Sequence, residues 1–379
     1  MDGRVRADEP PHTSHMTHEG ETTMAKFDPT LVGCRGDWKK YAENPVFGEH
    51  DDFRFDVHVL TVDGLFRMYF SWRKHYSIAV TESPDGVHWS EPKLVLEPRP
   101  ETGWEDDVNR PTVVHKDGLY HMWYSGQTAG REFSSAEWTQ VYVEAASNDK
   151  GTSDIGYAVS RDGLTWERRD EPVLRPTQGW EQSSLMCPSV LWDESEGRYT
   201  MWYSGGGWFE PDALGIATSK DGVTWERPLE TPVFTAEPKN IWERERVAGA
   251  HVVHHEEWYY LFYIGYEDMF KARICIARSR DGFSSWERHP QNPILSAGVP
   301  GGWDSESIYK PFAMYDEVDD RWTMWFNART GTTEQIGVAY HDGADLGFDS
   351  SSASPSRELA ERPDLCRSPT CDRHGTTRL

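Results

Sequence analysis

The feature that most constrains the fold is an Asp-Gly turn that recurs along the chain. It is found in SPDGVHW, SRDGLTW, SKDGVTW, SRDGFSSW and YHDG, with glycines at Gly86, Gly163, Gly222, Gly282 and Gly343. Successive turns are about 60 residues apart, although the first interval is longer. Because glycine accepts a positive φ and aspartate caps its own turn, each site predicts a tight β-hairpin.

The segments around each turn predict four strands per repeat. A short apolar run such as RPTVV is followed by an aromatic run such as LYHMWYSG, by IGYAVS before the turn, and by TWERRDEPVL after it. The aromatic runs are apolar on both faces, as in strands packed between neighbouring sheets. A four-stranded unit repeated radially is typical of a propeller, so the sequence predicts an all-β protein, a five-bladed β-propeller.

The fifth repeat lacks its last strand, and the N-terminal region contains a segment that can supply it. Residues 37–47, DWKKYAENPVF, match the final strands TWERRDEPVL and SWERHPQNPIL of other repeats. We expect this segment to close the ring, with its Tyr41–Phe47 part paired with Ile336–Tyr340. Closure would hide the sheet edge that an open array exposes.

The two ends of the chain are poor in apolar residues. We expect residues 1–30 to be a disordered leader, residues 31–346 the propeller and residues 347–379 a disordered tail. The longest repeat has its extra residues at 127–152, which are predicted to form a lip over one face of the ring. The sequence contains no signal peptide and no long apolar run, so a cytoplasmic location is expected.

Charge and cysteine content narrow the possible partners. The formal net charge is −24, which predicts that the chain binds neither nucleic acid nor an anionic membrane. The 5 cysteines are scattered and include no CxxC pair, so neither a disulfide framework nor a zinc site is indicated. No cofactor is predicted, although a structural metal ion on the propeller axis is left open.

Residues that recur in every repeat are predicted to be structural, whereas residues that differ between repeats are candidates for function. Four innermost strands are preceded by a tryptophan and an acid, which we expect to pack between blades: Trp104 and Glu105, Trp180 and Glu181, Trp242 and Glu243, Trp303 and Asp304. One position of the innermost strand differs in every repeat, where it holds Asp56, Arg110, Cys187, Gly249 and Lys310.

The innermost strands crowd the propeller axis, so these side chains are expected to converge on one funnel. Asp107, Glu245, Arg246 and Glu306 precede the variable position by three or four residues, and Trp72 and Arg73 add a ring and a cation from a neighbouring loop. Charges at this density are costly to bury unless they are solvated, paired or used. The funnel is therefore either an ion-paired, water-filled channel or a site for a ligand or for catalysis.

With these motifs, about residues 37–346 resemble the five-bladed propeller glycoside hydrolases of families 32, 43, 62, 68, 117 and 130. The resemblance implies an oligosaccharide or other small sugar as substrate, and catalysis by an aspartate on the first blade, an aspartate on the second and a glutamate further round. Asp56 in FRFDVHV matches the first aspartate and Asp107 in WEDDVNRP the second. The third blade has SSLMCPSV where the glutamate is usual, so Glu245 on the fourth blade is taken as its substitute.

Three functions agree with this resemblance. The leading prediction is a glycoside hydrolase with Asp56, Asp107 and Glu245 as catalytic residues. The predicted substrate-binding residues are Arg110, Lys310, Glu306, Arg246, His251, Trp72 and Arg73. The first alternative is a phosphorylase of the family 130 type, in which Arg110, Arg246, Lys310 and His251 would bind phosphate. The second is a non-catalytic sugar-binding propeller, which the missing glutamate of the third blade favours.

Overall fold

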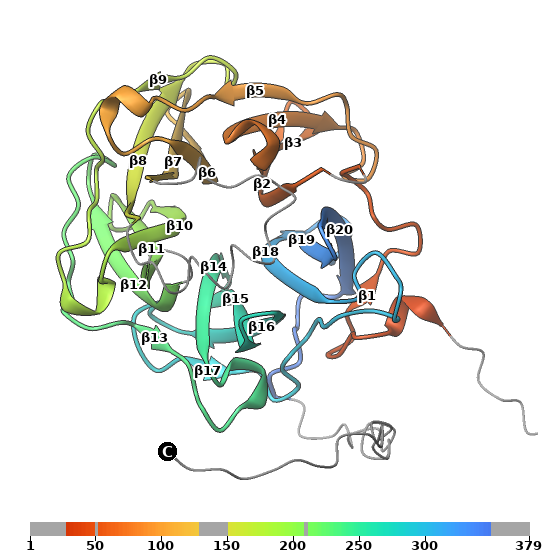
Figure 1. Cartoon of the computed structure of the whole chain (residues 1–379). Coiled ribbons are helices and arrows are strands. Elements are labelled where there is room, and N and C mark those ends of the chain that lie inside the picture. The colour runs from red at the N-terminus through yellow and green to blue at the C-terminus, as the bar shows by residue number, and fades with distance from the viewer. Residues whose placement is uncertain (1–27, 50–51, 129–150, 208–210, 350–379) are drawn as a thin grey trace, which may run out of the picture.

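A computed structural model of the chain describes residues 28–49, 52–128, 151–207 and 211–349. Its sheets stand around a central axis, each with its first strand nearest that axis (Figure 1). The five-bladed all-β propeller predicted from the repeats is confirmed. Most of the predicted lip, residues 129–150, lies outside the described residues.

Each blade consists of four antiparallel strands, which follow chain order from the axis outward in blades one to four, whereas the outermost strand of blade five is the N-terminal one. Blade one comprises β2 (Arg54–Val62), β3 (Leu65–Trp72), β4 (Ser77–Ser83) and β5 (Lys93–Leu96). Blade two comprises β6 (Asp107–Lys116), β7 (Leu119–Gln127), β8 (Ser153–Ser160) and β9 (Glu167–Arg168). Blade three comprises β10 (Ser184–Asp193), β11 (Arg198–Gly206), β12 (Pro211–Ser219) and β13 (Phe234–Thr235). Blade four comprises β14 (Arg246–His255), β15 (Trp258–Asp268), β16 (Lys271–Ser279) and β17 (Glu287–Arg288). Blade five comprises β18 (Ser307–Asp316), β19 (Arg321–Thr330), β20 (Thr333–Asp342) and β1 (Lys39–Lys40).

The fold also contains a bridge between two blades and several short 3₁₀ helices. A single parallel bridge between Ser153 and Ser184 joins blades two and three into one eight-stranded sheet. The described 3₁₀ helices are η1 (Pro29–Leu31), η2 (Arg73–His75), η3 (Pro100–Thr102), η5 (Gly179–Glu181) and η6 (Ile241–Glu243).

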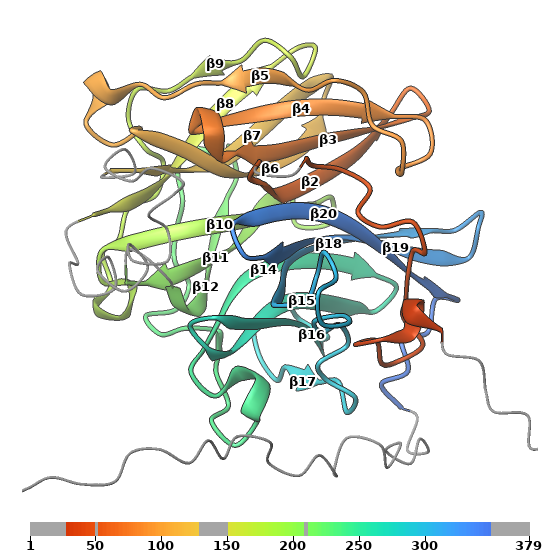
Figure 2. The same cartoon turned by 45° about the vertical axis from the view of Figure 1, so that its right-hand side comes forward.

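The N-terminal segment supplies the outer strand of blade five. Lys39 and Lys40 lie opposite Tyr340 and Ala339, and Phe47 forms a further bridge with Ile336. The Tyr41 amide also donates to the Val338 carbonyl at 2.9 Å. The predicted pairing of Tyr41–Phe47 with Ile336–Tyr340 is therefore present. Blades one and five lie side by side, with β2 close to β20 (Figure 2) and a bridge from Phe53 to Glu334.

The Asp-Gly turns also fasten neighbouring blades to each other. In the first turn, Asp85 Oδ1 accepts hydrogen bonds from the amides of Val87 and His88 at 2.9 and 2.8 Å, and Gly86 adopts a φ of 76°. The glycine carbonyl of four turns accepts a hydrogen bond from a buried ring of the preceding blade: Tyr69 to Gly163, Trp123 to Gly222, Trp202 to Gly282 and Trp325 to Gly86. Blade four has Phe262 at the equivalent position, and apolar packing against Trp38 takes the place of that bond.

Replacing Trp202 with phenylalanine is expected to destabilise the fold by roughly 1–3 kcal/mol, since it removes one buried hydrogen bond and leaves a small void. Phenylalanine fits the backbone at this position, because blade four uses it as Phe262. Urea unfolding of Trp202→Phe measures the loss, and Trp123→Phe should give a similar value. No change at either position would show that these bonds add nothing to stability.

The tryptophan–acid pairs are structural, as predicted. Glu105, Glu181 and Glu243 are fully buried and accept hydrogen bonds from Tyr124, Tyr203 and Tyr263 of the second strand of their own blades. Each also pairs with an arginine; for example, Arg227 Nε lies 2.7 Å from Glu181 Oε1. In blade five, Lys40 and Asp304 form the equivalent pair at 2.7 Å. These contacts tie the inner edge of a blade to its outer strand.

The packed part of the chain extends past the predicted boundary at residue 346. Phe348 is buried against Tyr260 and His289 of blade four, and Asp349 pairs with Arg278 at 2.7 Å. Phe348 is a single aromatic residue in a polar stretch, and such an isolated residue does not form a pattern that predicts a place in the core. No helix of the described residues is long and apolar enough to cross a membrane.

Candidate active site

Five β-bulges direct the variable position of each blade toward the axis. Asp56, Arg110, Cys187, Gly249 and Lys310 all adopt φ values between 52° and 59°, and the register of each innermost strand shifts at that point. Four of these bulges are held by a polar side chain of the preceding blade that accepts from the bulge amide: Ser71 for Arg110, Ser125 for Cys187, Ser204 for Gly249 and Asn327 for Asp56. The equivalence predicted for these five positions is confirmed.

The bulges are strained for every residue except glycine. A left-handed backbone costs a non-glycine residue roughly 1–2 kcal/mol. Such strain collects at functional sites, where a side chain must be aimed in a direction that a regular strand does not allow. The four non-glycine residues Asp56, Arg110, Cys187 and Lys310 also line one cavity.

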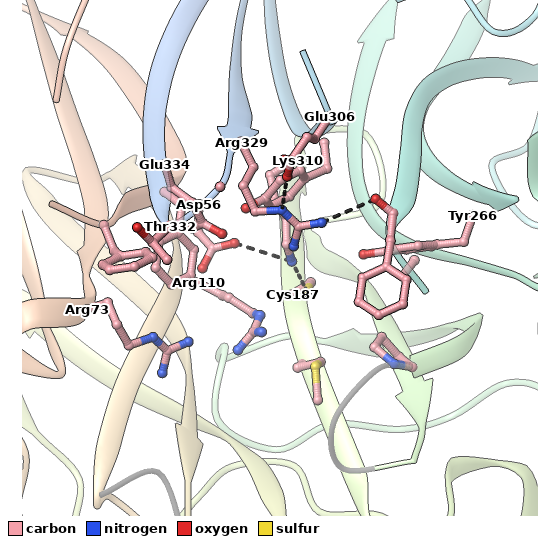
Figure 3. A pocket seen from close by; sticks show the side chains of 18 residues that line it. Asp56, Arg73, Arg110, Cys187, Tyr266, Glu306, Lys310, Arg329, Thr332 and Glu334 are labelled. Carbon is pink, nitrogen blue, oxygen red and sulfur yellow. Dashed lines mark hydrogen bonds and ion pairs between the residues drawn. The ribbon is translucent and has the colours of Figure 1, made fainter. Parts of the chain in front are cut away.

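This cavity has a volume of about 280 Å³ and is lined by residues of all five blades (Figure 3). Asp56, Cys187 and Glu334 form its deep end, with exposed fractions of 5%, 7% and 7%. Phe270, which is 48% exposed, stands at its mouth. The other charged and aromatic residues of the described wall are Arg73, Arg110, Glu306, Lys310, Arg329, Phe53, Phe55, Tyr266 and Tyr309.

Asp56 is held at the deep end by two neighbours. Lys310 Nζ lies 3.4 Å from Asp56 Oδ1, and the Ser71 hydroxyl donates to Asp56 Oδ2 at 2.9 Å. Asp56 Oδ1 accepts no hydrogen bond from the described residues. This oxygen is itself buried, so the Lys310 ammonium is the described group that compensates its charge.

Glu334 is a second carboxyl group in the same cavity that the sequence analysis did not select. Burial raises the pKa of Glu334 above its usual value, and the charge of Asp56 acts in the same direction. A hydrogen bond from Tyr309 and the charges of Arg329 and Arg73 oppose this shift. Two carboxyl groups with different environments in one cavity are the arrangement that separates an acid from a base.

Glu334 could have been found by the same comparison of repeats. The candidates came from the innermost strands alone, whereas Glu334 lies at the start of the third strand of blade five. The equivalent positions in the other blades hold Tyr76, Ser153, Asp212 and Ala272, so this position also varies from blade to blade.

Four cations line the cavity beside its three described carboxyl groups. Arg73 forms an ion pair with Asp107, and Arg110 donates to Gln127 Oε1 at 3.0 Å. Arg329 lies 3.9 Å from Glu306 and donates to the Phe270 carbonyl at 3.2 Å. The wall is thus cationic on balance, although the whole chain carries a formal charge of −24.

Asp107 and Glu245, two of the three predicted catalytic residues, are not among the described residues of the cavity wall. Asp107 is buried, where it pairs with Arg73 and accepts a hydrogen bond from Asn109 at 2.9 Å. Its place is behind Arg73, which it orients. Glu245 is exposed, and its backbone amide donates to the Tyr266 carbonyl at 3.1 Å. Both precede the bulge of their strand, but so does Glu306, which does line the cavity. The position of a residue relative to the bulge therefore does not by itself decide whether its side chain faces the cavity.

Five of the predicted substrate-binding and catalytic residues do line the cavity, namely Asp56, Arg73, Arg110, Glu306 and Lys310. Trp72 does not, because its indole donates to Asp52 at 2.9 Å and packs against His75 and Arg54. Arg246 is turned toward Asp212, at 3.9 Å.

His251 lies in a second void of about 40 Å³ on the axis. This void shares four lining residues with the cavity, namely Asp56, Arg110, Cys187 and Lys310. His251 Nε2 lies 2.9 Å from the Ala313 carbonyl, and the His251 ring packs on Phe312 together with that of His58. The described residues contain no group of three or more His, Cys, Asp or Glu side chains arranged to hold a metal ion.

The burial of His58 near the axis predicts that the protein loses stability in acid. Burial lowers the pKa of the His58 imidazole to about 3 in the folded protein, whereas the same group has a pKa of about 6.5 in the unfolded chain. As the pH falls below about 6.5, the unfolded chain therefore binds a proton that the folded protein does not bind. The contribution of neutral His58 to the free energy of unfolding is complete above pH 6.5 and is lost as the pH falls toward 3. His58 alone should account for roughly 2–3 kcal/mol between pH 7 and 4.5. Urea unfolding at both pH values measures this loss, which should shrink in His58→Gln. An unchanged pH dependence in that variant would contradict the assignment.

Comparison with known proteins identifies the family of this chain. The sequence profile of glycosyl hydrolases family 43 matches residues 42–337. The chain is 30% identical over 221 residues to a 1,2-β-oligomannan phosphorylase from Thermoanaerobacter sp. (strain X514), a match that covers 57% of the chain and 63% of that protein. The chain therefore spans less than two thirds of the length of this curated relative.

Solved structures agree on the fold. A thermostable family-43 glycoside hydrolase superposes with a TM-score of 0.60 at 20% identity, covering 78% of this chain and 91% of the other. A β-1,2-mannobiose phosphorylase from Listeria innocua superposes with a TM-score of 0.59 at 12% identity, covering 81% and 97%. The profile match extends over most of the propeller. The chain therefore belongs to glycosyl hydrolases family 43.

Proposed function

We propose that the protein hydrolyses a glycosidic bond at the deep end of the cavity, with Glu334 as general acid and Asp56 as general base. The observation that carries this proposal is the contrast between the two carboxyl groups. Asp56 is ion-paired with Lys310, whereas burial raises the pKa of Glu334 and favours its protonated form. Glycoside cleavage requires one carboxyl group of each kind.

The proposed reaction uses both groups at once. Asp56 takes a proton from a water molecule, whose oxygen attacks the anomeric carbon of the sugar. The bond from this carbon to the leaving oxygen breaks, and that oxygen takes the proton of Glu334. Ser71 and Lys310 keep the Asp56 carboxylate in place during this transfer. The pairing of an acid with a base favours catalysis over the sugar-binding alternative.

Phosphorolysis is the second candidate, and the cationic wall favours it. Arg73, Arg110, Lys310 and Arg329 lie around one cavity, and arginine is suited to bind phosphate through paired hydrogen bonds. A phosphate oxygen would then attack the anomeric carbon in place of water. The similarity to a 1,2-β-oligomannan phosphorylase supports this candidate as well. His251 and Arg246, which the sequence analysis also assigned to phosphate, do not line the cavity.

Product analysis separates the candidates. The protein is incubated with a panel of oligosaccharides that includes β-1,2-linked mannobiose and mannotriose, with and without inorganic phosphate. Hydrolysis should give free sugars at a rate that phosphate leaves unchanged. Phosphorolysis should give a sugar 1-phosphate in the presence of phosphate alone. Calorimetric binding of a sugar without turnover in either condition would contradict both and favour a binding protein.

A further inference from the structure

Cys187 and Lys310 form a contact between a thiol and an amine in the wall of the cavity. Lys310 Nζ donates to Cys187 Sγ, and the same nitrogen lies 3.4 Å from Asp56 Oδ1 (Figure 3). The bulges at Cys187 and Lys310 bring the two side chains into contact, because both residues adopt the left-handed backbone that directs side chains toward the axis. Oxidants act on the sulfur of cysteine, and an amine at hydrogen-bonding distance is placed to react with that sulfur once it is oxidised.

Cys187 differs from the other two cysteines that the structure describes. Cys275 is fully buried in the core of blade four, where burial raises the pKa of its thiol well above the usual value. Burial also raises the pKa of Cys34, whose thiol donates to the Thr30 carbonyl at 3.3 Å. Cys187 instead lines both the cavity and the axial void, so a small oxidant that enters the cavity can reach it.

We propose that Cys187 and Lys310 are an oxidant-sensitive pair that a hydroperoxide converts into a covalent sulfur–nitrogen cross-link. In the first step, the Cys187 sulfur attacks one oxygen of hydrogen peroxide and the O–O bond breaks. The sulfur keeps that oxygen as a sulfenic acid, and the other oxygen takes up the thiol proton and leaves as water. In the second step, Lys310 gives up a proton and its amine attacks the sulfur. The S–O bond breaks and its oxygen leaves as a second water molecule.

The cross-link would disable the site already described. Lys310 is the cation nearest to Asp56 among the ion pairs of the described residues. A bond between the Lys310 nitrogen and the Cys187 sulfur removes the ammonium charge. It also moves the nitrogen toward Cys187. Asp56 then loses the partner that holds its carboxylate in place. This loss of activity rests on the proposed role of Asp56, whereas formation of the cross-link does not.

Peptide mapping of the full-length protein tests the cross-link. The protein is treated with hydrogen peroxide and digested without reductant. We expect the peptides that contain Cys187 and Lys310 to be joined, with the loss of two hydrogens and no added oxygen. Dithiothreitol should release them. In parallel, treated protein should lose most of its turnover of whichever sugar the untreated protein cleaves, and dithiothreitol should restore it.

Two variants make the result specific. Lys310→Arg keeps a cation but has no nucleophilic amine, so Cys187 should take up oxygen without forming a cross-link. Cys34→Ser should leave the cross-link unchanged. The proposal is overturned if Cys187 of the unsubstituted protein stays reduced while Cys34 is oxidised, or if Cys187 gains oxygen without a link to Lys310. If the untreated protein cleaves no sugar, the proposed function fails and the peptide map still decides the cross-link.

Discussion

Asp56→Asn is expected to lower kcat by about a thousand-fold or more while leaving the fold intact. The substitution removes the charge of the base and keeps its size. Asparagine is also among the few residues that tolerate a positive φ, so the 59° of Asp56 adds no new strain. Steady-state kinetics give the loss of kcat, and thermal unfolding checks that the variant is folded.

Glu245→Gln is the matched control for Asp56→Asn. Both changes turn a carboxylate into an amide before or within the innermost strand of a blade, but Glu245 is exposed and outside the described cavity wall. We expect its kcat to be unchanged. If Glu245→Gln lost activity and Asp56→Asn kept it, the base would have to be sought elsewhere and the roles inferred from the cavity would be wrong.

Glu334→Gln is expected to lower kcat for natural oligosaccharides by roughly 10²–10⁴-fold, because no acid remains to protonate the leaving oxygen. Aryl glycosides with a good leaving group, such as dinitrophenyl glycosides, need little protonation and should lose far less. The ratio of the two losses is the measurement. Equal losses on both substrates would show that Glu334 binds the sugar and does not act as an acid.

The pH profile gives a second test of Glu334. The group is active when protonated, so activity should fall as the pH rises through its pKa, which burial raises above the usual value for glutamate. In Glu334→Gln, this decrease on the alkaline side should vanish for aryl glycosides, since the amide does not titrate. A profile that is unchanged in the variant would assign the decrease to another group.

The sequence by itself determined the propeller and the way its ring is completed. An Asp-Gly turn, an aromatic strand and a tryptophan–acid pair are local patterns, and their repetition leaves few arrangements that bury every aromatic face. The same repetition identified the variable position that holds Asp56 and Lys310. It also matched residues 37–47 to an outer strand, because a missing strand in one repeat can be filled by any segment with the same pattern.

Only the tertiary structure decided which charged residues face the cavity. Asp107 and Glu245 lie within four residues of a bulge, yet one is buried behind Arg73 and the other is exposed. Glu334 reaches the cavity from a third strand, where the first and last blades meet. A side chain at the end of a strand points where the bulge, the turn and the neighbouring blade together direct it. That direction depends on contacts between residues far apart in the chain, which no local pattern records.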